Sequence, residues 1–480
     1  MIQQPNIFIP KWLTRQSIYA YCALLIVVSA LFFRRIMPPL FMLIGVASVG
    51  AFFYYANVLS KRWCTISPHT YEKRLWKYGL SIRIVYVIAS YIFYLVMTGK
   101  PFEFGSADAW IYHLCAKGMA HQLANGNWHF QEILSQSMGQ DVAFSDSGYA
   151  AYLSLVYLLS GSSIIAARIL KAVWSTWTVV LMYRLARNHF GEEIGRMTGV
   201  LCLLMPNLIY YCGLHLKETE MLFLVVFYLQ KADELLILRQ FKLKNLLPVG
   251  LAAFALFSFR TVLGVVALLA LATALVFSSS RVVKWGRRIL IGIIALGFVG
   301  LTMQEQIISE IDEVAQTDAR EQQRRNMEWR AEREGGNTFA KYAGAAIFAP
   351  LIFTIPFPTM VHVDSQENQM MIHSGNYVKN ILSFFTLFAL LTLVLSGEWR
   401  KHVFPLAFML GYLLVLVFSN FAQSERFHMP VLSVELMFAA MAIFTVGNKQ
   451  KIRRWFNYWT ILIVIANIGW AYIKLKGRGL

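Results

Sequence analysis

The chain has 480 residues, of which 57% are hydrophobic and only 15% are charged, and its mean hydropathy is +0.52. Soluble globular chains carry about 25% charged and about 45–50% apolar residues, so this composition is shifted toward that of a membrane protein. It excludes an intrinsically disordered chain and a collagen-like repeat. The net charge of +18 fits either nucleic-acid binding or basic loops on the cytoplasmic side of a membrane, and its distribution decides between them.

The N-terminal segment has the features of a signal anchor that is retained. It contains basic residues, then an apolar run and the pair Arg34–Arg35, without a small-residue cleavage site. The five cysteines show no CxxC motif and no zinc-ligand spacing, so the sequence predicts neither a disulfide framework nor a metal cluster.

Apolar segments long enough to cross a membrane recur along the chain, since a spanning helix needs about 20 mostly apolar residues. Thirteen candidate spans lie at about 18–33, 38–58, 80–98, 165–185, 195–212, 220–238, 247–259, 261–279, 289–304, 377–396, 403–420, 430–446 and 457–473. Two less regular apolar segments, 149–163 and 343–361, are expected not to cross, and the second contains three prolines that disfavour an unbroken helix. We therefore predict an all-α polytopic integral membrane protein with about 13 transmembrane helices, between 12 and 14, forming a single domain over residues 1–480.

The positive charge is concentrated in four connections between these spans, at 60–79, 239–244, 281–288 and 449–454. By the positive-inside tendency these connections face the cytoplasm. That orientation places a first large loop, 99–148, and a second loop region, 304–376 with an interfacial segment, on the outer side. The pair Arg34–Arg35 and the basic C-terminus fit this orientation less well. The charge of the chain is therefore an orientation signal, and no motif supports a nucleic-acid partner.

The first outer loop contains the best candidate for a catalytic group. Residues 107–124 are predicted to form a short helix along the membrane interface, in which Asp108, Tyr112 and Ala116 share one face because they are spaced by four. In a functional interpretation, Asp108 is a general base that takes a proton from an acceptor hydroxyl. In the alternative, Ser106 or Asp108 is an ordinary helix cap. Glu103 is a second carboxylate that either replaces this base or alters its pKa.

Several segments resemble a known family. They are DAWIYHLCA at 108–116, GYAAYLSLVYLLSG at 148–161, AARILKAVWSTWTVVLMYRLARNHFG at 166–191, IGRMTGVLCLLMPNLIYYCGLHLKETEMLF at 194–223 and SERFHMPVLSVELMFAA at 424–440. Together they resemble the GT-C superfamily of polytopic membrane glycosyltransferases. The likeness is greatest to family 39-like bacterial enzymes related to protein O-mannosyltransferases and to the lipid A aminoarabinose transferase. It covers 99–240 and 419–446, and the middle of the chain only by hydropathy.

The resemblance implies a GT-C-like fold, a polyprenyl-phosphate-linked sugar donor, transfer on the outer face of a bacterial inner membrane, and an Asp base that Asp108 matches. The family often has a second acidic residue next to this Asp, but this chain has Ala109, so a metal-binding version of the site is not expected. Relatives with the aminoarabinose pattern have a Lys before two prolines at the next helix, where this chain has 146–149, Asp-Ser-Gly-Tyr. The lipid-linked sugar is a co-substrate, and no further cofactor is indicated.

Because a polyprenyl phosphate is already a good leaving group, the enzyme must position the acceptor, remove its proton and hold the departing phosphate. Cations are needed for the last task, and the candidates are Arg426 with His428 beside it, then Lys217, then Arg260. Each of them has an alternative role in a structural ion pair or in snorkelling to headgroups. Glu218 either pairs with Lys217 or binds a sugar hydroxyl.

The sequence thus predicts an inverting glycosyltransferase of the cell membrane whose acceptor is a glycan, a glycolipid or a protein, with membrane lipids as its surroundings. Two alternatives remain open. One is a polysaccharide polymerase or ligase of a surface-glycan pathway. The other is a flippase or transporter of lipid-linked sugars, although the internal repeat common in transporters is not apparent in this chain.

Overall fold

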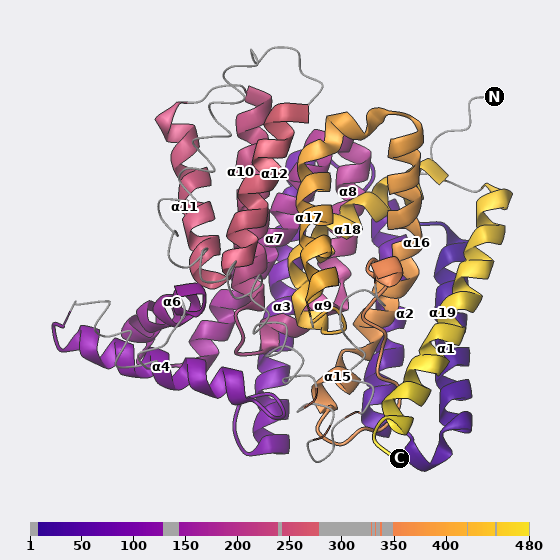
Figure 1. Ribbon diagram of the computed structural model, residues 1–480, viewed down its shortest axis with the longest axis horizontal. Helices are drawn as coiled ribbons and strands as arrows, with labels where there is room; N and C mark the ends of the chain where they lie inside the picture. Colours follow the sequence, from indigo (N-terminus) through magenta and orange to yellow (C-terminus); the bar gives the residue numbers. More distant parts are fainter. Residues whose placement is uncertain are drawn as a thin grey trace. The chain divides into compact units, whose positions relative to one another are not determined.

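The computed structural model describes residues 8–127, 144–238, 242–277, 349–419, 421–446 and 449–479, together with the single positions 328, 332 and 337. Within these ranges the chain is helical apart from turns and one isolated antiparallel bridge between Ile36 and Val361 (Figure 1). The predicted all-α class is confirmed for this part of the chain. The predicted span 289–304 and the basic connection 281–288 lie outside the described residues, and so does the loop 304–342 apart from positions 328, 332 and 337.

Eight helical segments in the described ranges are long and apolar enough to cross a membrane, which is the makeup of a multi-pass membrane protein. They are α1 (Lys11–Leu31), α2 (Pro39–Arg62), α3 (Pro68–Thr98), α7 (Ile164–Phe190), α16 (His373–Leu395), the run Glu398–Phe418 formed by η5 (Glu398–His402) and α17 (Val403–Phe418), α18 (Glu425–Val446) and α19 (Gln450–Lys476).

The other described helices are shorter or carry more charge. They are η1 (Phe33–Arg35), α4 (Ala107–Ala124), α6 (Phe144–Ser160), α8 (Glu192–Leu204), α9 (Pro206–Tyr210), η2 (Tyr211–Gly213), α10 (Glu218–Leu238), α11 (Leu243–Phe259), α12 (Thr261–Phe277) and α15 (Glu367–Met371).

Two segments differ from their predicted form. The range 195–212, expected as one span, is divided into α8, α9 and η2, because Pro206 has no N–H and disfavours a helical conformation at Met205, whose ψ is 117°. The range 149–163, expected to be less regular, is mostly the continuous helix α6. In the described part of 343–361, from residue 349, a short 3₁₀ turn is followed by non-helical chain, as its prolines predict.

The helix predicted at 107–124 is present with those bounds as α4. It packs along α6 through Cys115, Met119, Leu123 and Ala150. Figure 1 shows α4 and α6 running across the direction of α7, α10 and α11. The pair is thus a separate layer at one end of these helices.

The contacts divide the chain into two compact units, each of which we describe by itself. One is Val58–Ala267, and the other combines Met1–Asn57 with Leu268–Leu480. We call them the central unit and the terminal unit. In the terminal unit, Gly45 allows the Tyr21 hydroxyl and the His373 ring to lie against α2, where a Cβ would collide with both. These two side chains are hydrogen-bonded at 2.6 Å and link α1 to α16.

The same unit gives Arg35 an acidic neighbour. Arg35 Nη1 lies 3.5 Å from Asp364 Oδ2, and the Arg35 carbonyl accepts a hydrogen bond of 2.8 Å from the His362 N–H. Arg35 belongs to the basic pair that fits the predicted orientation poorly. A carboxylate at this position partly compensates its charge.

Candidate functional site

The first turns of α7 carry two buried cations. The helix starts behind Ser163, whose Oγ accepts the Ala166 N–H at 3.3 Å, and Arg168 and Lys171 follow one turn apart. Both side chains are almost fully buried, with Arg168 0% and Lys171 1% exposed. Burial of a charge is costly unless partners surround it, so the neighbours of these two residues define a polar site.

Lys171 anchors the loop that leads into α10. Its Nζ donates to the carbonyl oxygens of Leu214, at 3.0 Å, and Leu216. It also lies 3.4 Å from Glu220 Oε2 and 3.4 Å from the Tyr149 hydroxyl. Because the two carbonyls flank His215, Lys171 fixes the backbone on both sides of that residue.

Arg168 approaches the loop between α3 and α4. Its Nη2 donates to the Pro101 carbonyl, and its guanidinium carbon lies 6.0 Å from the centre of the Tyr91 ring. Glu103, only 4% exposed, follows in the same loop and accepts a hydrogen bond from the His215 backbone. Burial raises the pKa of the Glu103 carboxyl, and the opposing effects of Arg168 and Lys171 do not cancel it.

We refer to Glu103, Arg168, Lys171, His215 and Glu220 as the α7 N-terminal cluster. Several of its buried polar atoms have no hydrogen-bond partner among the described residues: Glu103 Oε2, Arg168 Nε and Nη1, His215 Nδ1 and Glu220 Oε1. Such atoms are uncommon in folded proteins and need an explanation. The same cluster therefore contains both unsatisfied donors and unsatisfied acceptors, which suits a ligand that carries hydroxyl groups and an anionic group.

Four of the predicted site residues lie around this cluster. Lys217 Nζ donates to the Phe259 carbonyl at the end of α11, at 2.9 Å, and Glu218 is the buried first residue of α10. Tyr112 packs edge-to-face on Tyr149, with ring centres 4.9 Å apart. Arg260 follows Phe259 directly and is half-buried in the turn between α11 and α12. The structure therefore brings Lys217, Glu218, Tyr112 and Arg260 into one region of the central unit.

Asp108 lies in the first turn of α4 and is exposed. Ser106 occupies the N-cap position, so Asp108 is not itself the cap, and a carboxylate in this turn is stabilised by the helix dipole. Tyr112 and Ala116 are buried, although the spacing predicts that they share a face with Asp108. Asp108 is therefore the exposed member of a face whose other two residues are buried.

Arg426 and His428 belong to the terminal unit. His428 Nδ1 accepts a hydrogen bond of 2.8 Å from Lys379, and its Nε2 donates to the Ala422 carbonyl at 2.7 Å. Both ring nitrogens therefore hold the start of α18 in place. Arg426, half-buried in the first turn of α18, lies 5.8 Å from the centre of the Phe427 ring.

Sequence reasoning missed Arg168, Lys171 and His215. A signal was present for the first two, because they are charged residues one turn apart within an apolar segment, and intramembrane charges usually mark functional sites. His215 carries no such signal, since its importance depends on Lys171 and on neighbours that are distant in the sequence.

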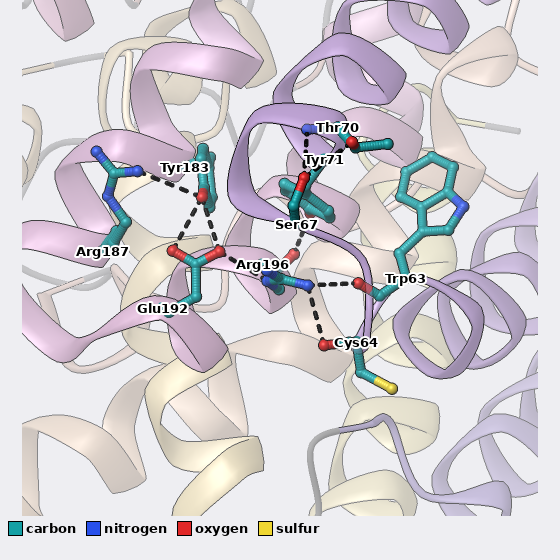
Figure 2. Close-up of polar contacts among 9 residues, drawn as sticks. All are labelled: Trp63, Cys64, Ser67, Thr70, Tyr71, Tyr183, Arg187, Glu192 and Arg196. Atoms are coloured by element: carbon teal, nitrogen blue, oxygen red, sulfur yellow. Dashed lines mark hydrogen bonds and ion pairs between the residues drawn. The ribbon is translucent and has the colours of Figure 1, made fainter.

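The other end of α7 holds a second polar group, shown in Figure 2. Arg196 Nε pairs with Glu192 Oε1 at 2.7 Å, and its Nη1 donates to the carbonyls of Trp63, at 2.7 Å, and Cys64, at 2.9 Å. Arg196 thereby ties α8 to the connection between α2 and α3.

Two tyrosines complete this second group. The Tyr183 hydroxyl donates to the Glu192 carboxylate, at 2.8 and 3.0 Å from its oxygens, and lies 3.5 Å from Arg187 Nη1 (Figure 2). The Tyr71 hydroxyl donates to the Arg196 carbonyl at 2.6 Å. We call Tyr71, Tyr183, Arg187, Glu192 and Arg196 the α7 C-terminal network. All of their buried side-chain nitrogen and oxygen atoms have partners.

No family model, curated protein or solved structure matches the chain.

Proposed function

We propose that the protein is a membrane glycosyltransferase that moves a sugar from a polyprenyl-phosphate donor to an acceptor hydroxyl on the outer face of the membrane, with inversion at the anomeric carbon. The observation that carries this proposal is the α7 N-terminal cluster, whose unsatisfied donors and acceptors suit a phosphorylated sugar. The resemblance of 108–116 and its following segments to GT-C enzymes adds independent support.

The cluster offers groups for each task of the transfer. Arg168 has two unsatisfied guanidinium nitrogens and is suited to bind the departing phosphate, with Lys171 adding positive charge nearby. Glu103 has an unsatisfied carboxylate oxygen, and burial raises its pKa, which makes the ionised carboxylate a stronger base. The resemblance implies Asp108 as the base. The exposure of Asp108 supports a role in binding the molecule that receives the sugar. The burial of Glu103 supports its role as the group that takes up the proton.

In the proposed step, the acceptor oxygen forms a bond to the anomeric carbon while its proton passes to Glu103. The bond between the anomeric carbon and the phosphate oxygen breaks on the opposite side, and its electron pair leaves with the polyprenyl phosphate. Arg168 stabilises the negative charge that develops on this leaving group. Lys217, Glu218, Arg260 and Tyr112 are proposed to line the surroundings of the sugar.

The test compares Glu103→Gln and Asp108→Asn in membranes that supply the native acceptors, using a panel of undecaprenyl phosphates carrying radiolabelled mannose, glucose or galactose. We expect Glu103→Gln to lose kcat, and Asp108→Asn to raise the concentration of acceptor that is needed. Glu193→Gln, an exposed carboxylate on α8, is the matched control. Unimpaired transfer by both site variants would contradict the assignment. Loss of kcat in Asp108→Asn alone would show that Asp108, and not Glu103, is the general base.

The polymerase or ligase alternative uses the same lipid phosphate chemistry but a longer glycan. The length of the radiolabelled product on gels distinguishes the two, since a transferase adds a single sugar. A ladder of products, or transfer of a preformed chain, would replace the proposed function.

A buried ion pair in the terminal unit favours a second candidate function, a transporter. Lys379 Nζ lies 3.5 Å from Glu435 Oε2, and both residues belong to candidate spans, α16 and α18. Ionisable groups within membrane spans often mark ion or substrate pathways. Flux of a lipid-linked sugar into proteoliposomes without glycoside formation, abolished in Glu435→Gln, would support this candidate.

A further inference from the structure

His215, in the loop that leads into α10, has one bonded and one unbonded ring nitrogen. The side chain is fully buried. Its Nε2 lies 3.1 Å from the Tyr157 hydroxyl on α6, whereas its Nδ1 has no hydrogen-bond partner among the described residues. Because an unbonded polar atom is costly at this depth, Nδ1 is a candidate contact for a ligand.

The surrounding residues hold this imidazole in one place. Lys171 Nζ donates to the carbonyls of Leu214, at 3.0 Å, and Leu216, and so fixes the backbone on both sides of His215. The Tyr157 ring stacks beside the imidazole, with ring centres 6.2 Å apart. A side chain that is already fixed loses little conformational freedom when a ligand binds to it.

The hydrogen bonds also determine which nitrogen of His215 carries a hydrogen. The Tyr157 hydroxyl lies 2.7 Å from His113 Nδ1 on α4, so it has a histidine on either side. Burial, with cations nearby, lowers the pKa of both histidines. At neutral pH each ring is therefore uncharged and carries one hydrogen.

Two arrangements of these hydrogens are possible, and the distances and neighbouring charges favour one. Hydroxyl donors form shorter hydrogen bonds than N–H donors. The 2.7 Å contact therefore fits Tyr157 donating to His113, and the 3.1 Å contact fits His215 Nε2 donating to Tyr157. His215 Nδ1 then carries a lone pair, which the positive charges of Lys171 and Arg168 favour over a hydrogen. Nδ1 is thus a hydrogen-bond acceptor.

We propose that His215 Nδ1 accepts a hydrogen bond from one hydroxyl group of the sugar on the lipid phosphate, and that it makes the enzyme specific for that hydroxyl. The inference rests on the proposed function, in which the sugar binds at the α7 N-terminal cluster. A bare nitrogen lone pair binds a hydroxyl, whereas a phosphate oxygen has no hydrogen to donate to it. A sugar without this hydroxyl leaves Nδ1 unsatisfied in the complex, so the site discriminates against it.

The first test compares donors that differ by one hydroxyl group. The probes are undecaprenyl phosphate carrying the best-used sugar among mannose, glucose and galactose, and analogues of it that each lack one hydroxyl. We expect the wild type to lose about tenfold or more in kcat/KM with one analogue, and His215→Phe to use that analogue and the intact donor equally well. Discrimination against the other analogues should not change.

The matched control is His121→Phe, the same substitution at an exposed histidine on α4, which should discriminate as the wild type does. The proposal would be overturned by a wild type that uses every analogue as well as the intact donor. It would equally be overturned by a His215→Phe variant whose discrimination matches that of the wild type.

The second test keeps the imidazole and changes only its partner, so it also applies where His215→Phe does not fold. Tyr157→Phe removes the acceptor for the Nε2 hydrogen, which is then free to move to Nδ1, and discrimination against the same analogue should fall severalfold. The control is Tyr152→Phe on the same helix, whose hydroxyl instead accepts a hydrogen bond from the Trp174 indole. Unchanged discrimination in Tyr157→Phe would contradict the assigned direction of the hydrogen bonds.

Failure of this inference can be distinguished from failure of the proposed function. A wild-type protein that transfers none of the intact sugars overturns the proposed function. An active wild type whose discrimination is unaffected at His215 and Tyr157 overturns only the role of His215.

Discussion

The two ends of α7 hold polar groups of opposite character. The helix has 27 residues and is therefore about 40 Å long, enough to cross a membrane. At its C-terminal end, the network of Tyr71, Tyr183 and Arg196 satisfies all its buried polar atoms. At its N-terminal end, Glu103 and Arg168 lie buried with unsatisfied oxygen and nitrogen atoms.

This difference separates residues that stabilise the fold from residues whose polar atoms are available to bind a ligand. A group such as Arg196 makes all its hydrogen bonds within the protein. Its removal lowers stability, because its buried partners are left unsatisfied. An unsatisfied group such as Arg168 gains by binding a ligand, since the ligand supplies the missing hydrogen bonds. Substitutions at the two ends are therefore expected to change different quantities.

The largest expected effect is on catalysis at the N-terminal end. Glu103→Gln removes the proposed base while keeping the size of the side chain, so kcat for sugar transfer should fall by about 1,000-fold. The unfolding temperature should not fall, because the amide avoids the cost of ionising a buried carboxyl. Initial rates and heat unfolding of the same purified sample check both statements, and a large loss of stability would place Glu103 with the structural residues.

The next effect is on stability at the C-terminal end. Arg196→Ala leaves Glu192 with only the Tyr183 hydroxyl as a donor and leaves two backbone carbonyls without the guanidinium, so it should lower the free energy of unfolding by about 3 kcal/mol. Transfer per folded molecule should stay unchanged. Arg168→Met is the paired variant and should cost less stability but bind the donor more weakly. Equal losses of stability in the two variants would remove the distinction between the ends.

A smaller effect concerns pH. The pKa of Glu103 is raised in the folded protein, so its contribution to stability is fully present below the unfolded value of 4.5 and is lost as pH rises through the folded value. Over that window the slope is at most about 1.4 kcal/mol per pH unit, and it should disappear in Glu103→Gln. The value of kcat/KM should rise with pH over the same window, because only ionised Glu103 accepts a proton. Identical pH–stability curves for wild type and variant would contradict the shift.

The smallest effect is again structural. The Ser67 Oγ caps α3 by accepting the Thr70 N–H at 3.3 Å, next to the C-terminal network (Figure 2). Ser67→Ala should cost about 1 kcal/mol and leave transfer unchanged. A chemical unfolding curve measures the first, and initial rates measure the second. A loss of transfer would mean that the two ends are coupled.

Much of the helical layout could be predicted from the sequence, because hydropathy and helical spacing are local. The bounds of α4 at 107–124 were predicted, and so was the surrounding pattern of apolar helices. Hydropathy does not predict the division at Pro206, because it measures the apolar character of the segment and not the missing N–H of proline. Glu103 was identified from its place in the loop. Arg168, Lys171 and His215 were not, because burial and hydrogen bonding depend on residues far apart in the sequence.

The most direct test of the central claim measures binding of undecaprenyl phosphate to purified protein by its effect on the unfolding temperature. At about 100 times its Kd this ligand should stabilise the wild type and Arg196→Ala by about 2.7 kcal/mol each, because both retain the N-terminal cluster. Arg168→Met should gain little or nothing. The same stabilisation in all three proteins would contradict the claim that the unsatisfied end of α7 binds the lipid phosphate.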